Sequence, residues 1–552
     1  MLFHKGFVMS KHVDMASGKP IDNLAEAIRR ISTLPADLTG TLDGIRNILS
    51  DLKQNPPEAT LYLAILEELR KPLRQTVRAV SKGKYHDKPL PHTGATETAF
   101  NHVISSLRLM NQAYGHCKLL LPEDADARHY AQILHRNIHY VTRIVFEHYR
   151  ARLDLPVGIW KEAHGYYEEA VHHNLADRAI IDALEGGQSI STAASYIALL
   201  LVDLANPYAH GADEQELIFR LARLGAPLVK IEMPDSMLDI PPFILDLGTD
   251  LPLHPPVHSE IGQSARCLDT NPLGTHMESL HTRLKTEEMP PSIPLGDDLD
   301  KVDCGLLIAV LELIYAPWMQ ARIPRRFHRY TGQGKINVCS GFEQAHLAIS
   351  GAPFAQPHGQ HYPDRALSSN AEIVRLFQLD DQQLVDEKSV RKNRSLLMLR
   401  PDTWYVVDQS ASGFRLSRSI VGTSVSHGEL LAVQPQDSEN YVLSRISWLM
   451  QDASGLHAGL AVLPGMPKAV AVSALASDNQ QKVHLTQYEQ AFLMPGLGHL
   501  GTEPFLIIPL GLWKQSEGKI SMVIENNIVP VVLEKVLRTG RNFVMLSYKV
   551  ES

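Results

Sequence analysis

The spacing of apolar residues changes character partway along the chain. From about Asp22 to Ile231, apolar residues recur mostly at three- and four-residue steps, as at Leu66, Leu69 and Leu73. This spacing gathers apolar side chains on one face of an α-helix. Beyond about residue 320, short runs rich in β-branched and aromatic residues alternate with polar turns, which is typical of antiparallel barrels and sandwiches. We therefore expect an α+β multidomain protein, all-α at its N-terminus and β-rich at its C-terminus.

Prolines and glycines divide this pattern into four regions. Breakers such as Pro56-Pro57, Pro122 and Gly186-Gly187 separate long amphipathic segments, which predicts an antiparallel helical domain over residues 20–235. Prolines then interrupt every candidate element, so residues 236–303 are expected to connect two domains, with edge strands such as 243–247. A helix over 304–319 should introduce an antiparallel β-barrel over residues 304–480, with an insertion at about 351–395. Residues 481–552 should form an additional small β unit.

Length and composition exclude several classes of protein. A chain of 552 residues is too long for one ordinary core, so two to four domains are expected. The net charge of −8 disfavours general nucleic-acid binding. Four widely spaced cysteines indicate neither a disulfide framework nor a zinc site. No apolar run is long enough for a membrane span and the N-terminus lacks a signal peptide, so we expect a cytoplasmic protein.

The stretch 408–413, with the sequence Asp-Gln-Ser-Ala-Ser-Gly, joins two strand-like runs and carries the most specific signal in the chain. Upstream, Arg325 and Arg329 stand at i and i+4, with Arg326 between them. Guanidinium groups present planar sets of donors that suit phosphate oxygens and the guanine edge. The Asp408 carboxylate can accept from guanine donors, and the Ser410 hydroxyl can bond either way.

This arginine pair followed by Asp-x-Ser-x-x-Gly resembles the PilZ domain, a bacterial six-stranded barrel that binds cyclic di-GMP. The resemblance covers about residues 320–475. It implies that Arg325 and Arg329 clamp phosphate and guanine with help from Arg326. It also implies that Asp408 and Ser410 read the guanine edge, and that Gly413 makes room for the base.

The resemblance leaves two points open. Arg329 and Asp408 are 79 positions apart (408 − 329), farther than the family pattern, which we interpret as an insertion into the barrel. Arg391 and Arg394 lie closer to Asp408, although at i and i+3, and are the alternative source of the clamp. Strand-like segments over 335–349 can belong either to the barrel or to the C-terminal β unit.

A metal-binding helical bundle is the main enzyme alternative. His164, Glu168 and His172 follow one another at four-residue steps, as His135 and His139 do. Glu169 and His172 form a Glu-x-x-His motif, but residues 20–235 contain no second matching one, and a zinc-protease motif and a phosphate-loop sequence are missing. We interpret the glycine-rich stretch 496–501 as a turn. We therefore expect no catalytic residue, metal or cofactor.

The function that the sequence favours is a bacterial cyclic di-GMP receptor that neither makes nor degrades its ligand. Its helical domain would transmit the signal to an unidentified protein partner. A structural adaptor with a degenerate PilZ fold that has lost the ligand is the other alternative. The process controlled and the oligomeric state remain open.

Overall fold

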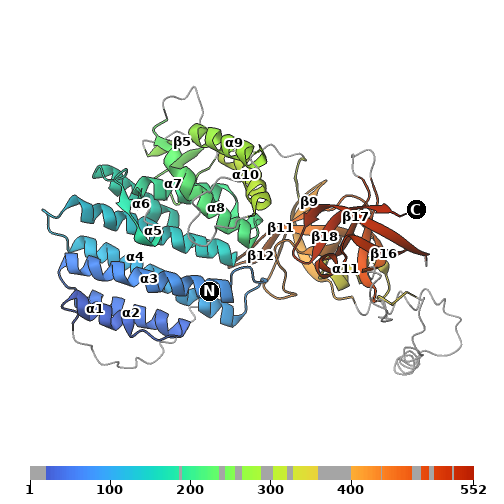
Figure 1. Cartoon of the computed structure of the whole chain (residues 1–552), viewed down its shortest axis with the longest axis horizontal. Helices are drawn as coiled ribbons and strands as arrows, with labels where there is room; N and C mark the ends of the chain where they lie inside the picture. Colours follow the sequence, from blue (N-terminus) through green and yellow to red (C-terminus); the bar gives the residue numbers. More distant parts are fainter. Residues whose placement is uncertain are drawn as a thin grey trace.

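The computed structural model shows a helical domain followed by two β-barrels along the long axis of the molecule (Figure 1), which confirms the α+β architecture. Among the described residues, no helix combines the length and apolar character that a bilayer-spanning segment needs. The structure describes residues 20–185, 189–234, 243–254, 264–286, 303–319, 327–357, 399–436, 438–474, 487–496, 503–524 and 527–551.

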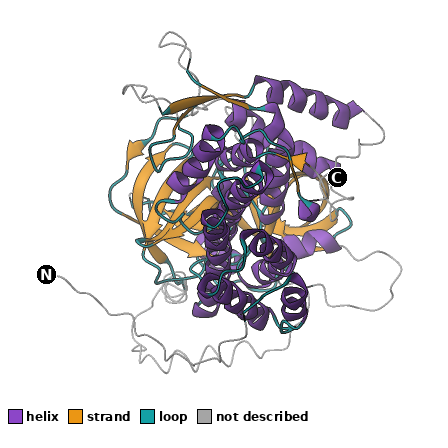
Figure 2. Ribbon diagram, turned by 90° about the vertical axis from the view of Figure 1, so that its left-hand side faces the viewer, coloured by secondary structure: helices purple, strands orange, loops and turns teal. Residues whose placement is uncertain are grey.

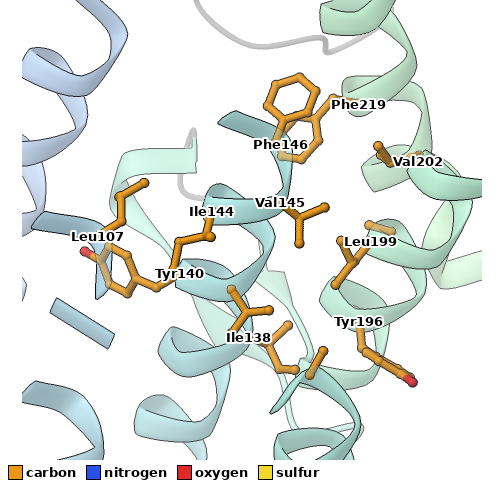
Figure 3. Packing of buried hydrophobic residues seen from close by; sticks show 14 of the residues in the cluster. Leu107, Ile138, Tyr140, Ile144, Val145, Phe146, Tyr196, Leu199, Val202 and Phe219 are labelled. Carbon is orange, nitrogen blue, oxygen red and sulfur yellow. The ribbon is translucent and has the colours of Figure 1, made fainter. Parts of the chain in front are cut away.

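The helical domain is built around one long central helix, α5 (Ala127–Ala151), whose residues are buried on nearly all sides from Ile133 onward. Figure 3 shows its apolar side chains between neighbouring helices, with Phe146 stacked on Phe219 at 4.3 Å between ring centroids. Side-chain caps at Asp37, Thr93 and Ser191 satisfy free amide groups where helices begin. The other helices of this part are α1 (Leu24–Ser32), α2 (Leu38–Gln54), α3 (Ala59–Lys84), α4 (Gly94–Leu119), α6 (Ile159–His172), α7 (Thr192–Leu204) and α8 (Ala212–Gly225).

Helix α10 (Cys304–Met319) packs in the helical domain, whereas the expected ranges assigned it to the barrel region. Its buried side chains join the helical core, and Trp318 Nε1 donates to Leu201 O at 2.8 Å. The reason is its strongly apolar composition, which needs a helical surface to cover it. Before it come α9 (Asn271–Thr286) and a small sheet of β3 (Lys230–Glu232), β5 (Ala265–Asp269) and β4 (Ile244–Asp246), in that order.

The first barrel closes with six antiparallel strand positions. Short β6 and the following β7 pair in succession along one edge of β8, and β9 pairs along its other edge, so β6 and β7 occupy one position. The remaining order is β7-β10-β11-β12-β9. Closure gives each strand from β7 to β12 a partner on both edges, which reduces exposed sheet edges. The strands are β6 (Tyr330–Thr331), β7 (Lys335–Ser340), β8 (Asp402–Ser410), β9 (Gly413–Arg418), β10 (Leu430–Gln434), β11 (Val442–Asp452) and β12 (Gly455–Val462).

The second barrel is also closed and six-stranded, in the order β13-β14-β15-β18-β17-β16. It is larger than the small β unit expected from residue 481, because β13 comes from within the range assigned to the first barrel. A short helix, α14 (Leu510–Gln515), follows β15. The strands are β13 (Lys468–Ala474), β14 (Glu489–Met494), β15 (Phe505–Pro509), β16 (Lys519–Ile524), β17 (Asn527–Thr539) and β18 (Phe543–Val550).

The segment over 335–349 divides into a strand and a helix. Strand β7 belongs to the first barrel, whereas α11 (Phe342–Ser350) includes Gln344–Ile349, for which we expected a strand. Gly341, at φ +86°, redirects the chain after β7. Ala345 of α11 then lies in an apolar core shared by both barrels, with Leu430 on one side and Phe492 on the other.

The helical domain is joined to the first barrel by backbone hydrogen bonds. Leu90 and Val425 exchange N–H···O bonds of 2.8 Å in both directions, and the Leu90 side chain is buried in the barrel core. Asp154 N donates to Gln451 O at 2.9 Å. Figure 2 shows helices in front of the strands along this direction. The two parts therefore share buried contacts.

His427 provides a test of this junction, because its Nε2 lies 3.0 Å from Ala209 O and 3.2 Å from Ser447 O. Burial, together with the guanidinium groups of Arg152 and Arg445, lowers the pKa of His427 to about 3. As the pH falls, the unfolded chain therefore binds a proton at His427 before the folded chain does. The stability that the neutral His427 contributes is present above about pH 6.5 and is lost as the pH falls below it.

Lowering the pH from 7.5 to 5.5 should reduce the free energy of unfolding by about 1 kcal/mol through protonation of His427 in the unfolded chain. His427→Gln keeps an N–H donor without titrating, so urea unfolding of this variant should depend less on pH than that of the natural chain. His276→Gln, on an exposed position of α9, is the matched control and should leave the pH dependence unchanged. Equal pH dependence in the His427→Gln variant would show that the junction does not exclude the charged imidazole.

Candidate nucleotide-binding site

The Asp-x-Ser-x-x-Gly segment forms the tight end of the β8–β9 hairpin. Ser410 pairs with Gly413 and Asp408 pairs with Arg415 across the two strands. The turn is held locally, since Ser410 Oγ lies 3.4 Å from both Ser412 N and Gly413 O. A polar turn between two strands is what the residue types predict. The hairpin therefore fixes Asp408 and Ser410 close together at one end of the first barrel.

A bent strand brings the distant arginine segment to this hairpin. Strand β6 ends 71 positions before β8 begins (402 − 331), and it aligns Thr331 with Asp408 before β7 aligns Lys335 with Tyr405. The chain bends at Gly334, whose φ is +97°. In the neighbouring β8, Val407 forms a β-bulge, because it is an extra residue between Val406 and Asp408, which both pair with β9. Arg329, immediately before β6, thus lies beside Asp408 although the insertion separates them in sequence.

Arg329 and Asp408 form an ion pair with 2.6 Å between Nη1 and Oδ1. The two side chains are 33% and 22% exposed, so solvent and a ligand can reach both. A charge-assisted hydrogen bond of this kind orients the guanidinium of Arg329. A guanidinium has several N–H donors, so others can bind a ligand. Of the expected site residues, the structure thus brings together Arg329, Asp408, Ser410 and Gly413. Arg325 and Arg326, and the alternative pair Arg391 and Arg394, lie outside the described residues.

One cationic residue beside Asp408 was not among the residues expected from the sequence. Exposed Arg415 lies directly opposite Asp408 in β9, and its guanidinium carbon is 5.9 Å from the ring centroid of Trp448. Asp408 therefore has an arginine on each side. Counting pairs back from the two-residue turn would have found Arg415, because Ser410–Gly413 and Asp408–Arg415 are in the same register.

Gly413 has a structural role that the resemblance did not imply. A Cβ at this position would lie 2.0 Å from Leu460 O in the backbone of β12. Real Cβ atoms do not approach a carbonyl oxygen so closely, so the absence of a side chain lets β9 and β12 pair. The glycine is thus explained by barrel closure before any ligand is considered.

The histidines behind the metal alternative are bound to protein groups. His164 Nε2 lies 2.9 Å from Leu251 O and its Nδ1 lies 2.6 Å from Tyr196 Oη. Burial lowers the pKa of His164, which keeps the imidazole neutral in this arrangement. His172, near the end of α6, has its ring against that of His173. In the part of the chain that the structure describes, no three His, Cys, Asp or Glu side chains gather as a metal site.

Comparison with known families gives a result for the helical part of the chain. Residues 25–235 match the family model described as the N-terminal domain of the cyclic-di-GMP receptor FimW. No curated protein matches the chain. The family match supports a cyclic di-GMP receptor and falls on the helical domain, whereas the PilZ-like motif falls on the first barrel.

Replacing Gly413 by alanine should destabilise the first barrel by about 1–3 kcal/mol, because β9 and β12 must separate to admit the methyl group. Thermal unfolding measures the effect. The matched control is Gly83→Ala on an exposed position of α3, where no atom lies within 4 Å of the new Cβ and helix propensity favours alanine. An unchanged melting temperature for Gly413→Ala would contradict the close approach of the two strands.

Proposed function

We propose that this chain is a cyclic di-GMP receptor of the bacterial cytoplasm that binds its ligand at the β8–β9 end of the first barrel. The observation that carries the proposal is the ion pair between Arg329 and Asp408, which unites the two separated parts of the PilZ-like motif. The family match of residues 25–235 supports the same ligand independently. The ligand residues of the proposal are Arg325, Arg326, Arg329, Asp408, Ser410 and Arg415, with Gly413 shaping the turn.

Electrostatics suits a ligand with two phosphates. Before binding, the charge of Arg329 is compensated by Asp408 at 2.6 Å. A phosphate can share the remaining donors of this guanidinium, and Arg415 on the far side of Asp408 offers a second cation. Arg325 and Arg326 remain part of the proposal from their place in the sequence. Among the described residues of the proposed site, two arginines, Arg329 and Arg415, accompany one carboxylate, that of Asp408.

Base recognition would use the acceptor groups of the hairpin. The Asp408 carboxylate can accept hydrogen bonds from guanine N1–H and N2–H₂, since its second oxygen adds lone pairs beyond the one that Arg329 uses. The Ser410 hydroxyl lies on the same strand two residues away and can donate or accept. The Trp448 ring beyond Arg415 offers an aromatic face for a base. None of these groups needs to perform covalent chemistry, so the proposed activity is binding alone.

The helical domain is the proposed output part. The first barrel is joined to it through Leu90 and Val425, and Arg152 O accepts from Gln451 N at 2.8 Å. A ligand that changes the position of barrel strands therefore acts on a surface that the helical domain shares. We propose that a protein partner reads this change on the helices. The second candidate function, an adaptor that has lost the ligand, keeps the same contacts and differs only in nucleotide binding.

Calorimetric titration with cyclic di-GMP tests the proposal. Hydrogen bonds to charged groups contribute about 1.5–3 kcal/mol each, so replacing Arg325 and Arg329 together by alanine should weaken binding at least about a hundredfold. Asp408→Ala should weaken it as well, because guanine donors lose their acceptor. The melting temperature should change little, since a partly exposed ion pair such as that of Arg329 and Asp408 contributes at most about 1 kcal/mol.

The double replacement of Arg391 and Arg394 is the matched control, with the same loss of charge at the alternative pair. It should leave the affinity near that of the natural chain. Loss of binding there, with binding retained in the Arg325 and Arg329 double variant, would move the clamp to the alternative pair. Absence of binding by the natural chain at tens of micromolar ligand would favour the adaptor.

A further inference from the structure

Exposed apolar side chains lie at the end of the helical domain that is farthest from the barrels. Helix α5 contacts the first barrel at its C-terminal end, where Arg152 O accepts from Gln451 N–H. At about 1.5 Å per residue, its 25 residues extend about 37 Å from that contact (Figure 1). Beside the start of α5, Leu119 and Leu120 at the end of α4 and Val171 at the end of α6 are exposed, Leu119 by 78% and Val171 by 45%. These three residues define the distal surface.

Ion pairs show that α4 and α6 end side by side. Arg108 of α4 pairs with Glu162 of α6, and nearer to both C-terminal ends Lys118 pairs with Glu169 at 2.6 Å. The two helices therefore run parallel. Tyr130, in the first turn of α5, donates to the carboxylate of Glu169. The distal surface is thus one face made by two helix ends, next to the start of a third helix.

Charged groups around the distal surface are mostly acidic. Residues 116–130 and 166–173 carry two bases and five carboxylates, a net charge of −3 (2 − 5) with neutral histidines. The adjoining turn over 53–58, located by the bond from Cys117 Sγ to Ala59 O, adds one base and one acid and leaves this value unchanged. The bases are Lys118 and Arg128, and the carboxylates are Glu123, Asp124, Asp126, Glu168 and Glu169.

The two bases are already used within the helical domain. Lys118 pairs with Glu169, and Arg128 pairs with Asp126. The three remaining carboxylates are exposed and form no ion pair with a described residue; they are Glu123, Asp124 and Glu168. The distal surface therefore offers apolar contact surrounded by unpaired negative charge.

We propose that the distal surface docks a basic amphipathic segment of the protein partner. Apolar side chains of that segment cover Leu119, Leu120 and Val171, since exposed apolar patches mark interaction sites. Its lysines or arginines face the three unpaired carboxylates, which supplies charge complementarity. Recognition of this kind is typical of an amphipathic helix that lays its apolar face on a partner.

Charge decides against the other occupants. Nucleic acid and anionic lipid surfaces would be repelled by the carboxylates. A second copy of this chain, related by a twofold axis, would place the same acidic groups opposite one another. The inference rests on the proposed function for the existence of a partner. Helix α5 connects the two sites, because its C-terminal end contacts the first barrel and its start lies beside the distal surface.

Titration of labelled synthetic peptides with the full chain, in the absence of cyclic di-GMP, tests the proposal. The probes are an amphipathic helix of leucine and lysine and the same helix with glutamate in place of lysine. The lysine peptide should bind saturably and the glutamate peptide should not. Absence of saturable binding by the lysine peptide, or equal binding of both peptides, would overturn the proposal. Failure of the natural chain to bind cyclic di-GMP counts against the nucleotide site and leaves this result unaffected.

Two double variants locate the peptide on the chain. Leu119→Ser with Val171→Ser should weaken binding of the lysine peptide at least about tenfold, because apolar contact at the distal surface is lost. Val157→Ser with Val421→Ser is the matched control and should keep the natural affinity, since both valines are exposed but lie before α6 and between β9 and β10. Equal affinities of the two double variants would contradict the assigned surface.

Photo-crosslinking in the cell identifies the occupant. A photoreactive phenylalanine analogue replaces Leu119 in the full chain, and a control chain carries the analogue in place of Val157. Position 119 should capture a partner segment in which lysines or arginines and apolar residues recur at helical spacing. Capture of an acidic segment or of another copy of this chain, the same capture from both positions, or no capture from position 119 would overturn the proposal.

Discussion

The contact on which the rest of this structure depends is the insertion of Leu90 into the first barrel. The segment between α3 and α4 pairs its backbone with Val425, and the Leu90 side chain joins the core that also contains Trp404 and Leu456. Burying a leucine of this kind contributes roughly 1.5–3 kcal/mol. Asp87, close to Leu90, also forms an ion pair with Arg541 of the second barrel. One short segment of the helical domain thus contacts both barrels. A structural change in either barrel can therefore alter its contacts with the helical domain.

A second connection runs through the chain itself. The last residue of α10, Met319, is ten positions from Arg329 (329 − 319), and α10 is packed in the helical core through Trp318. The candidate site is therefore close in sequence to a helix that packs in the helical core.

Local patterns predicted much of the fold. Helical spacing identified the N-terminal domain, and β-rich runs identified most strands of both barrels, because these signals lie within a few residues of one another. Helix α11 was missed because Gln344–Ile349 is short and apolar, and only Gly341 and the packing between two barrels decide its conformation. The placement of α10 and the closure of the second barrel depend on contacts between residues far apart in sequence.

The candidate site shows the same division. The Asp-x-Ser-x-x-Gly hairpin could be predicted from residue types, whereas the pairing of Arg329 with Asp408 across 79 positions required the bent strand formed by β6 and β7. Gly413 was given a ligand role, although the backbone of β12 already explains it. His164 and His135 were considered as metal ligands. In the structure they form hydrogen bonds with Tyr196 and Ser195 of α7, and no short sequence pattern indicates that their helices pack against α7.

Hydrogen–deuterium exchange of the full chain, with and without saturating cyclic di-GMP, tests most directly the claim that the barrel binds this ligand and the helices read it. The account predicts slower exchange in the β8–β9 hairpin, together with a change in the segment around Leu90. Protection of the hairpin alone would confirm binding but remove the proposed route to the helices. No change in either region at saturating ligand would contradict the account.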